Sequence, residues 1–171
     1  GTGRTLNALF GQPHPMTRNR FLALLAITLV FRFWLAAALP ITGDEAYFIW
    51  WGKIPDWGFY DHPPMIGWWL AALLQISDAA WWLRLPATLL PAVIAWAAAR
   101  FLASRGENFA WSVAALILLA PLNVWNVIVT TDTALVYFSF FSALAWLRAA
   151  RDDDLRYYAL SGLFLAGAVL S

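Results

Sequence analysis

The chain has 171 residues, of which 62% are hydrophobic and 12% are charged, and its formal net charge is +1. Soluble domains carry about 25% charged residues, so this composition, with a mean hydropathy of +0.64, excludes an ordinary soluble domain and predicts an all-α, polytopic membrane protein. The small net charge gives no case for nucleic-acid binding, and the absence of cysteine excludes disulfides and thiolate metal sites.

The N-terminal residues are expected to form a tail that does not enter the membrane. We assign residues 1–20 to a cytoplasmic tail, because its last residues include Arg18 and Arg20, which flank the start of the first apolar segment. Met16 is a candidate natural start, in which case residues 1–15 are a non-native extension. His14 is then interpreted as a tail residue without a role.

Residues 21–40 form the first predicted span, since a helix rising about 1.5 Å per residue crosses about 30 Å of hydrocarbon over this length. Arg18 and Arg20 at its start favour a cytoplasmic position for that end. A cleaved signal peptide is the alternative, which we disfavour because the apolar run is too long for an h-region and no A-x-A site follows cleanly. Arg32 interrupts the span; it faces other helices or snorkels, and the pattern does not decide between these.

The next segment is predicted to lie at the membrane surface. Residues 44–51 read as a short helix that Gly43 and Asp44 can cap. Many of the 12 tryptophans lie in or near this region, and tryptophan favours the membrane–water interface. A double proline then starts a second apolar helix over residues 64–77, which is short for a span and is predicted to be interfacial as well.

Four further spans are predicted, at residues 81–99, 109–127, 134–150 and 157–171. With residues 64–77 at the interface, the basic residues between these spans all face the cytoplasm, and Asp44, Asp61 and Asp132 share the outer face. If residues 64–77 spanned instead, the loop Arg100–Arg105 would face outward and Asp132 would lie opposite Asp44. The positive-inside rule argues against that topology.

Asp44 and Glu45 are the first candidate site residues. Adjacent acids do not share a helix face, so we expect separate roles. One acts as a general base, and the other as an orienter, a metal ligand or a capping charge. The alternative is an N-capped interfacial helix whose acids only face water, and the pair alone does not decide between the two.

Asp61 and His62 form a second cluster, directly before the double proline. A carboxylate beside an imidazole at a rigid turn suits the binding of a metal or a phosphate. Asp44, Asp61 and His62 are therefore the candidate ligands of a divalent cation. The alternative is a capped helix start with an interfacial histidine. One histidine with scattered acids is weak evidence for a metal, and no H-E-x-x-H motif is present.

Two more polar residues are candidates near the outer ends of spans. Asp132 follows two threonines, and N-capping of the next helix explains it well; a functional role depends on the predicted topology. Arg84 lies within L-R-L-P and is a candidate phosphate contact, but the sequence favours an interfacial structural ion pair.

The motifs G-D-E-A-Y, D-H-P-P, R-L-P and T-D, in this order, resemble the N-terminal part of a GT-C glycosyltransferase. The likeness covers roughly Phe21 to the end, and is to the bacterial branch with lipid A aminoarabinose transferases, Rgt-type lipopolysaccharide sugar transferases and protein O-mannosyltransferases. Aminoarabinose transferases often have E-K-P-P where this chain has D-H-P-P, which favours the Rgt-like and mannosyl branches. Such enzymes have many more spans, so the chain is expected to be an N-terminal fragment that is inactive alone.

The resemblance implies a bacterial inner-membrane enzyme that moves a sugar from a polyprenyl-phosphate donor to a lipid, glycan or protein acceptor on the extracytoplasmic face. It implies Asp44 as the catalytic base, Asp61 and His62 near the donor phosphate or a metal, and Asp132 facing the same cavity. The residues fit such chemistry, because a sugar on a lipid phosphate needs only a base and positive charge at the phosphate. We predict inversion, a candidate divalent cation and no nucleotide cofactor.

A membrane transporter or flippase is the main alternative. It would place charge at mid-membrane on broken helices, whereas the acids here gather at one predicted surface. Arg32 is the feature that fits a transporter better. A structural membrane subunit would tolerate Asn or Ala in place of the acids. A membrane metalloprotease is disfavoured because no ligand motif is present.

Overall fold

The computed structural model describes residues 15–171, and each element in this range is helical. The prediction of an all-α fold is confirmed. The predictions for residues 1–14, including the tail assignment of His14, lie outside the described residues. The elements are α2 (Arg18–Ala38), α3 (Gly43–Lys53), α4 (Met65–Leu74), α5 (Ala80–Leu83), α6 (Leu85–Leu102), the 3-10 helix η1 (Ala103–Arg105), α7 (Glu107–Leu119), α8 (Pro121–Trp125), α9 (Thr131–Asp152) and α10 (Leu155–Val169).

Within the described residues, three helices are long and apolar enough to cross a membrane: α2, α6 with η1, and α9. They correspond to the predicted spans at residues 21–40, 81–99 and 134–150. Large apolar side chains stay exposed on them, such as Ile27 and Val30 on α2, as expected of helices that face lipid or further helices. The polytopic membrane class inferred from composition is confirmed.

The predicted span at residues 109–127 is interrupted in the structure. Helix α7 ends at Leu119, and the short α8 and an extended segment follow. Pro121 explains the break, because proline lacks an N–H and drives the preceding residue out of the helical region. Ala120 accordingly has an extended backbone, with φ −54° and ψ 133°.

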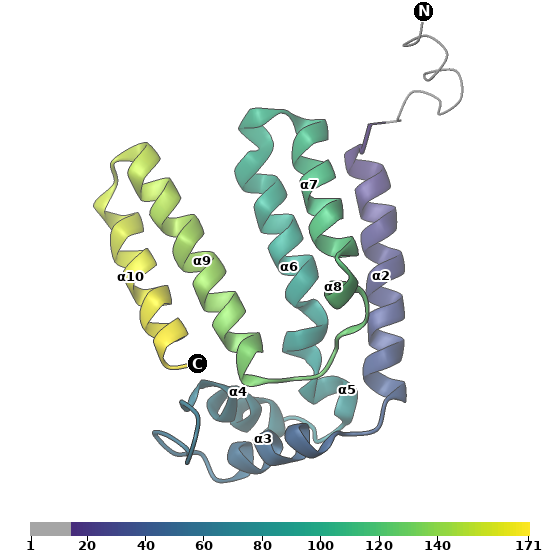
Figure 1. Cartoon of the computed structure of the whole chain (residues 1–171), viewed down its shortest axis with the longest axis vertical. Coiled ribbons are helices and arrows are strands. Elements are labelled where there is room, and N and C mark those ends of the chain that lie inside the picture. The colour runs from purple at the N-terminus through teal and green to yellow at the C-terminus, as the bar shows by residue number, and fades with distance from the viewer. Residues whose placement is uncertain (1–14) are drawn as a thin grey trace, which may run out of the picture.

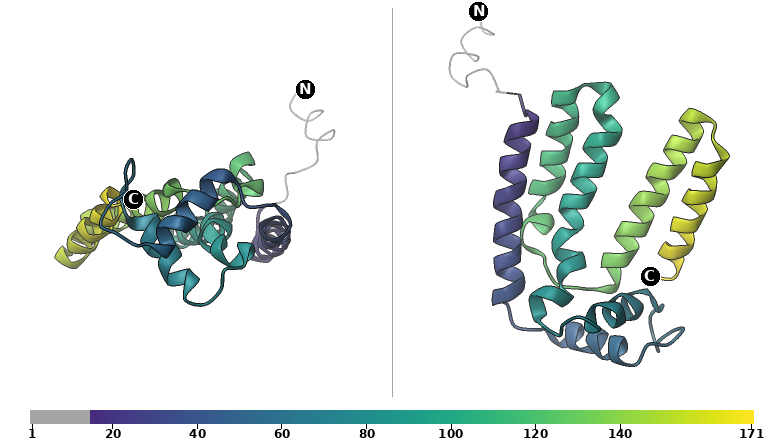
Figure 2. Two further views of the ribbon diagram at one scale, coloured as in Figure 1. Left: turned by 90° about the horizontal axis from the view of Figure 1, so that it is seen from below. Right: turned by 180° about the vertical axis from the view of Figure 1, so that it is seen from behind.

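Helices α3, α4 and α5 form a layer across one end of the bundle, roughly perpendicular to the long helices (Figure 1). The two predicted interfacial helices, at residues 44–51 and 64–77, are α3 and α4 in this layer. The start of α2, the α6–α7 turn and the α9–α10 turn lie at the opposite end (Figure 2). The arginines at those helix ends are Arg18, Arg20, Arg100, Arg105, Arg148, Arg151 and Arg156.

An aromatic core joins α3 to α4. Trp51 is buried and stacks on Phe59 with a centroid distance of 4.3 Å and an interplanar angle of 5°. Gly52 packs so closely that a Cβ there would lie 2.8 Å from Leu70 Cβ. The layer is therefore a packed unit rather than a loose loop.

The α9–α10 pair is held by small residues and by two reciprocal hydrogen bonds. Ser142 Oγ donates to Ser161 O at 2.9 Å, and Ser161 Oγ donates to Ser142 O at 3.0 Å. Small and hydroxyl side chains let membrane helices approach closely. The end of α10 returns to the layer, where Met65 N donates to Leu170 O at 3.0 Å.

Candidate functional site

The acidic start of α3 is held by a capping box. Thr42 is the N-cap: its hydroxyl accepts from Glu45 N, and the Glu45 carboxylate accepts from Thr42 N. The prediction that Gly43 and Asp44 cap this helix is therefore wrong. Asp44 occupies the second helical position and is exposed. Among residues 15–171, no hydrogen bond joins its carboxylate to another residue, so it is available to a ligand.

The start of α9 also has a threonine at its N-cap. Thr130 is the N-cap, and its N–H donates to Thr133 Oγ1 at 3.2 Å. The capping role considered for Asp132 is therefore wrong. Like Asp44, Asp132 occupies the second position behind a threonine cap and is exposed.

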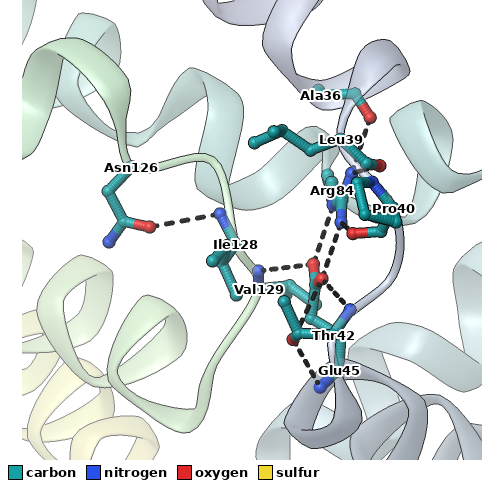
Figure 3. A network of polar contacts seen from close by, with 9 residues as sticks. All are labelled: Ala36, Leu39, Pro40, Thr42, Glu45, Arg84, Asn126, Ile128 and Val129. Atoms are coloured by element: carbon teal, nitrogen blue, oxygen red, sulfur yellow. Dashed lines mark hydrogen bonds and ion pairs between the residues drawn. The ribbon is translucent and has the colours of Figure 1, made fainter.

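Glu45 is fully buried and forms a bidentate ion pair with Arg84 (Figure 3). Arg84 Nε donates to Glu45 Oε1 at 2.8 Å, and Nη2 donates to Oε2 at 2.7 Å. This two-pronged geometry is the strongest form of an arginine–carboxylate contact. Glu45 therefore belongs to the scaffold and does not reach the surface where Asp44 is exposed.

The other N–H groups of Arg84 donate hydrogen bonds to backbone carbonyls at and just after the end of α2. Nη1 donates to Ala36 O and Leu39 O, and Nη2 donates to Pro40 O, at 2.8–2.9 Å. Guanidinium has five N–H donors, and all five have a protein acceptor here. Arg84 is buried and has no donor left for a phosphate. The structural ion pair, which the sequence favoured over a phosphate contact, is the arrangement observed.

The segment before α9 is tied to the same carboxylate. Val129 N donates to Glu45 Oε1 at 3.3 Å across 84 positions of the chain (Figure 3). Asp44 directly precedes Glu45, and Asp132 shortly follows Val129. One buried carboxylate thus holds together the two segments that carry the exposed acids.

The ionised form of Glu45 is the one this network favours. Burial alone would raise the pKa of the carboxyl, but hydrogen bonds from Arg84 and from the backbone N–H groups of Thr42 and Val129 hold the pKa below its ordinary value.

Asp61 and His62 lie in the turn that leads into α4. Their side chains are half exposed, with His62 Nε2 3.7 Å from Asp61 Oδ2. The imidazole packs edge-on against Trp51 and Phe48, with centroid distances of 5.7 and 6.1 Å. Phe48 lies one helical turn after Asp44, so the imidazole sits one turn along α3 from the exposed acid. Neither residue caps α4, whose N-cap is Pro64.

The candidate metal ligands are not gathered into one group. In the described part of the chain, no three His, Asp or Glu side chains lie close enough to hold a metal ion. Asp44, Asp61 and His62 therefore do not form a complete cation site within residues 15–171.

A cavity of about 500 Å³ lies among α2, α6, α8 and α9. Its walls are mostly apolar, and Asp132, Thr130 and Asn126 are among its polar lining residues. Asp44, Asp61 and His62 are not part of the lining. The structure thus separates the predicted site into an acid on this cavity and three residues along the α3–α4 layer.

Arg32, which the sequence did not explain, lies on the same cavity and is buried. Its Nη2 donates to Ala87 O at 2.6 Å, and Nε donates to Thr88 O at 2.8 Å. Pro91 occurs inside α6, and because proline has no N–H, the carbonyl of Ala87 lacks its helical donor. Arg32 supplies that donor.

The same guanidinium also donates hydrogen bonds to backbone carbonyls that follow the end of α7. Arg32 Nη2 donates to Asn126 O at 2.8 Å, and Nη1 donates to Asn123 O. Unpaired backbone groups are costly within a membrane. Arg32 therefore bonds backbone carbonyls of the proline-containing helix α6 and of the segment that follows the break at Pro121. The signal that would have identified it is the pair of prolines, Pro91 and Pro121, in otherwise apolar segments.

Comparison with known protein families identifies the family of this chain. Residues 61–171, most of the chain, match the dolichyl-phosphate-mannose-protein mannosyltransferase family. The chain belongs to this family. It is therefore part of a group of membrane glycosyltransferases with several membrane helices, and the GT-C resemblance seen in the motifs is confirmed.

A curated relative extends the match toward the N-terminus. The chain is 29% identical over 160 residues to the lipid A galacturonosyltransferase RgtD of Rhizobium johnstonii, covering 86% of this chain and 33% of that protein. The chain thus spans about a third of the length of the relative it matches. No solved structure gives a significant match.

Proposed function

We propose that the protein transfers a sugar from a polyprenyl-phosphate donor to a lipid, glycan or protein hydroxyl on the outer face of a bacterial inner membrane. Family membership over residues 61–171 carries the proposal. The two exposed acids, in segments joined through Glu45, support it. The relative is named for action on lipid A, so a lipid A saccharide is the first acceptor to test.

In the proposed reaction Asp44 is the general base. Its carboxylate takes the proton of the acceptor hydroxyl while that oxygen attacks the anomeric carbon. The bond from this carbon to the phosphate oxygen breaks, and the polyprenyl phosphate leaves. A single displacement inverts the anomeric configuration, without a covalent sugar intermediate or a nucleotide cofactor. The exposure of Asp44, and its freedom from capping, favour this role over one for Glu45.

Positive charge at the phosphate is assigned first to His62. Arg84 cannot supply it, because its five donors are already bonded. His62 is partly exposed beside Asp61 and one turn from Asp44. We assign no step to a divalent cation, since residues 15–171 gather no complete ligand set, and the cation stays a prediction.

The proposed orientation puts the α3–α5 layer outside. The arginines at the opposite helix ends would then face the cytoplasm, as the positive-inside rule requires. The donor lipid would reach the layer from the outer leaflet, beside the apolar helices.

The experiment uses the full-length protein in vesicles with a panel of radiolabelled polyprenyl-phosphate sugars and lipid A as acceptor. We expect label to leave one donor and appear on the acceptor, and the Asp44→Asn variant to show none of this loss. Movement of intact labelled donor across the membrane, without cleavage, would instead support the transporter alternative. Arg32, the residue that suggested transport, is already accounted for by its four backbone carbonyls.

A further inference from the structure

A second cavity lies toward the end of the bundle opposite α3–α5. It has a volume of about 350 Å³ and is formed between the last part of α6 and the α9–α10 hairpin. Aromatic and aliphatic side chains make most of its surface, among them Phe101, Phe141, Leu144 and Phe164. None of the residues assigned to sugar transfer lines it.

Among the residues that the structure describes, two arginines and no acid line this cavity: Arg100 from α6 and Arg148 from α9. The Arg148 guanidinium lies 4.9 Å from the centroid of the Tyr157 ring, and its Nε is 3.4 Å from Asp152 Oδ2. Asp152 also accepts from Arg151, so one carboxylate balances only one of these two arginines. Within residues 15–171, Arg100 has no ion-pair partner. Positive charge is therefore left at the cavity.

We propose that this cavity binds an anionic phospholipid, with its phosphate between Arg100 and Arg148 and part of an acyl chain on the aromatic floor. Guanidinium groups suit phosphate because they donate two parallel hydrogen bonds. Basic pockets between helices, at the depth of the headgroups, are typical sites for acidic lipids. The last turn of α6 and the end of α9 are at that depth if these helices cross the membrane.

This lipid site is separate from the proposed reaction. It lies at the other end of the long helices from Asp44 and Asp61, and its occupant is a component of the surrounding bilayer. A competing occupant is a further helix of the same protein, which would fill the cavity and exclude lipid.

The test is native mass spectrometry of the full-length protein in detergent, titrated with phosphatidylglycerol or with phosphatidylcholine of the same acyl chains. We expect the wild type to bind phosphatidylglycerol more tightly. Replacing both arginines (Arg100→Gln with Arg148→Gln) should lower this preference by roughly tenfold or more. The matched control, Arg105→Gln with Arg156→Gln, removes two charges at the same end but outside the cavity, and should keep the preference.

A second variant tests the apolar part of the site with both arginines in place. Leu144→Trp fills the floor of the cavity, so it should weaken binding of either lipid at the site and reduce the phosphatidylglycerol preference. Three results would overturn the proposal: no preference in the wild type, an unchanged preference in the Arg100/Arg148 variant, or an equal loss in the control pair. The first of these is the result expected if a helix fills the cavity.

Discussion

Arg84 and Glu45 are joined by two hydrogen bonds of 2.8 and 2.7 Å, although 39 positions separate them and both are buried. Through this pair the end of α2, the start of α3 and the start of α6 meet at one point. The same carboxylate holds Val129, just before α9. The pair therefore sets the position of the neighbouring Asp44 from within the protein interior.

Breaking this pair should destabilise the protein strongly. Removing one partner of a buried ion pair costs about 3–5 kcal/mol, because the remaining charge is left without its counter-ion. We expect this loss for Arg84→Met and for Glu45→Gln in thermal unfolding of the purified full-length protein. Arg156→Met changes an exposed arginine and should cost less than about 0.5 kcal/mol. Equal, small shifts for all three variants would contradict the structural role.

The same pair predicts a dependence of stability on pH. The pKa of Glu45 is lowered in the folded protein, so the unfolded chain takes up this proton first on acidification. The contribution of Glu45 is fully present above the unfolded-state pKa of about 4.3 and is lost as the pH falls through the folded-state pKa. Melting temperatures of the wild type should therefore fall more steeply below about pH 4.3 than those of Glu45→Gln. Parallel curves would show that Glu45 is not the responsible group.

Arg32 and Pro91 should be energetically coupled. Arg32→Met leaves the Ala87 carbonyl without a donor and should cost about 1–3 kcal/mol or more, as for other buried unpaired polar groups. Pro91→Ala restores a backbone N–H for that carbonyl. In a double-mutant cycle, the loss in free energy of unfolding caused by Arg32→Met should be about 1 kcal/mol smaller in the Pro91→Ala background than in the wild type. Strictly additive costs would contradict the proposed replacement of a missing helix bond.

The contact between α3 and α4 can be tested at Gly52. A side chain there would begin 2.8 Å from Leu70 Cβ and 3.0 Å from the Leu70 carbonyl carbon, which is backbone and cannot turn aside. Gly52→Val should lower stability by about 1–3 kcal/mol through overpacking. Gly162→Val is the matched control, since a Cβ at Gly162 meets no atom within 4 Å. A Gly52 variant as stable as the control would mean that the layer is loosely packed.

The sequence alone was sufficient for the class of the fold and for the starts of the two short helices α3 and α4. Long apolar runs and a double proline are local signals, and α3 and α4 begin within one residue of the predicted starts at 44 and 64. The predicted span at residues 109–127 joined two segments because Pro121 was given too little weight. A proline after an apolar run ends a helix even when the hydropathy continues.

The arrangement of the site depends on contacts that no local pattern contains. Separate roles were expected for the adjacent acids Asp44 and Glu45, but nothing near Glu45 in the sequence indicates that Arg84 will meet it and that Glu45 will be buried. The capping roles were also misplaced, because Thr42 and Thr130 each lie two residues before the acid that was considered. The roles of Asp44, Asp61, His62 and Asp132 in transfer stay predictions.

The most direct test of the central claim compares sugar transfer by the full-length wild type with transfer by the Asp44→Asn variant. Melting temperature and donor binding are measured for both proteins as controls. If Asp44 is the general base, transfer should fall by about 10²–10⁴-fold, while both melting temperature and donor binding stay unchanged, because its carboxylate has no structural partner within residues 15–171. Transfer within a few-fold of the wild-type rate would contradict the account.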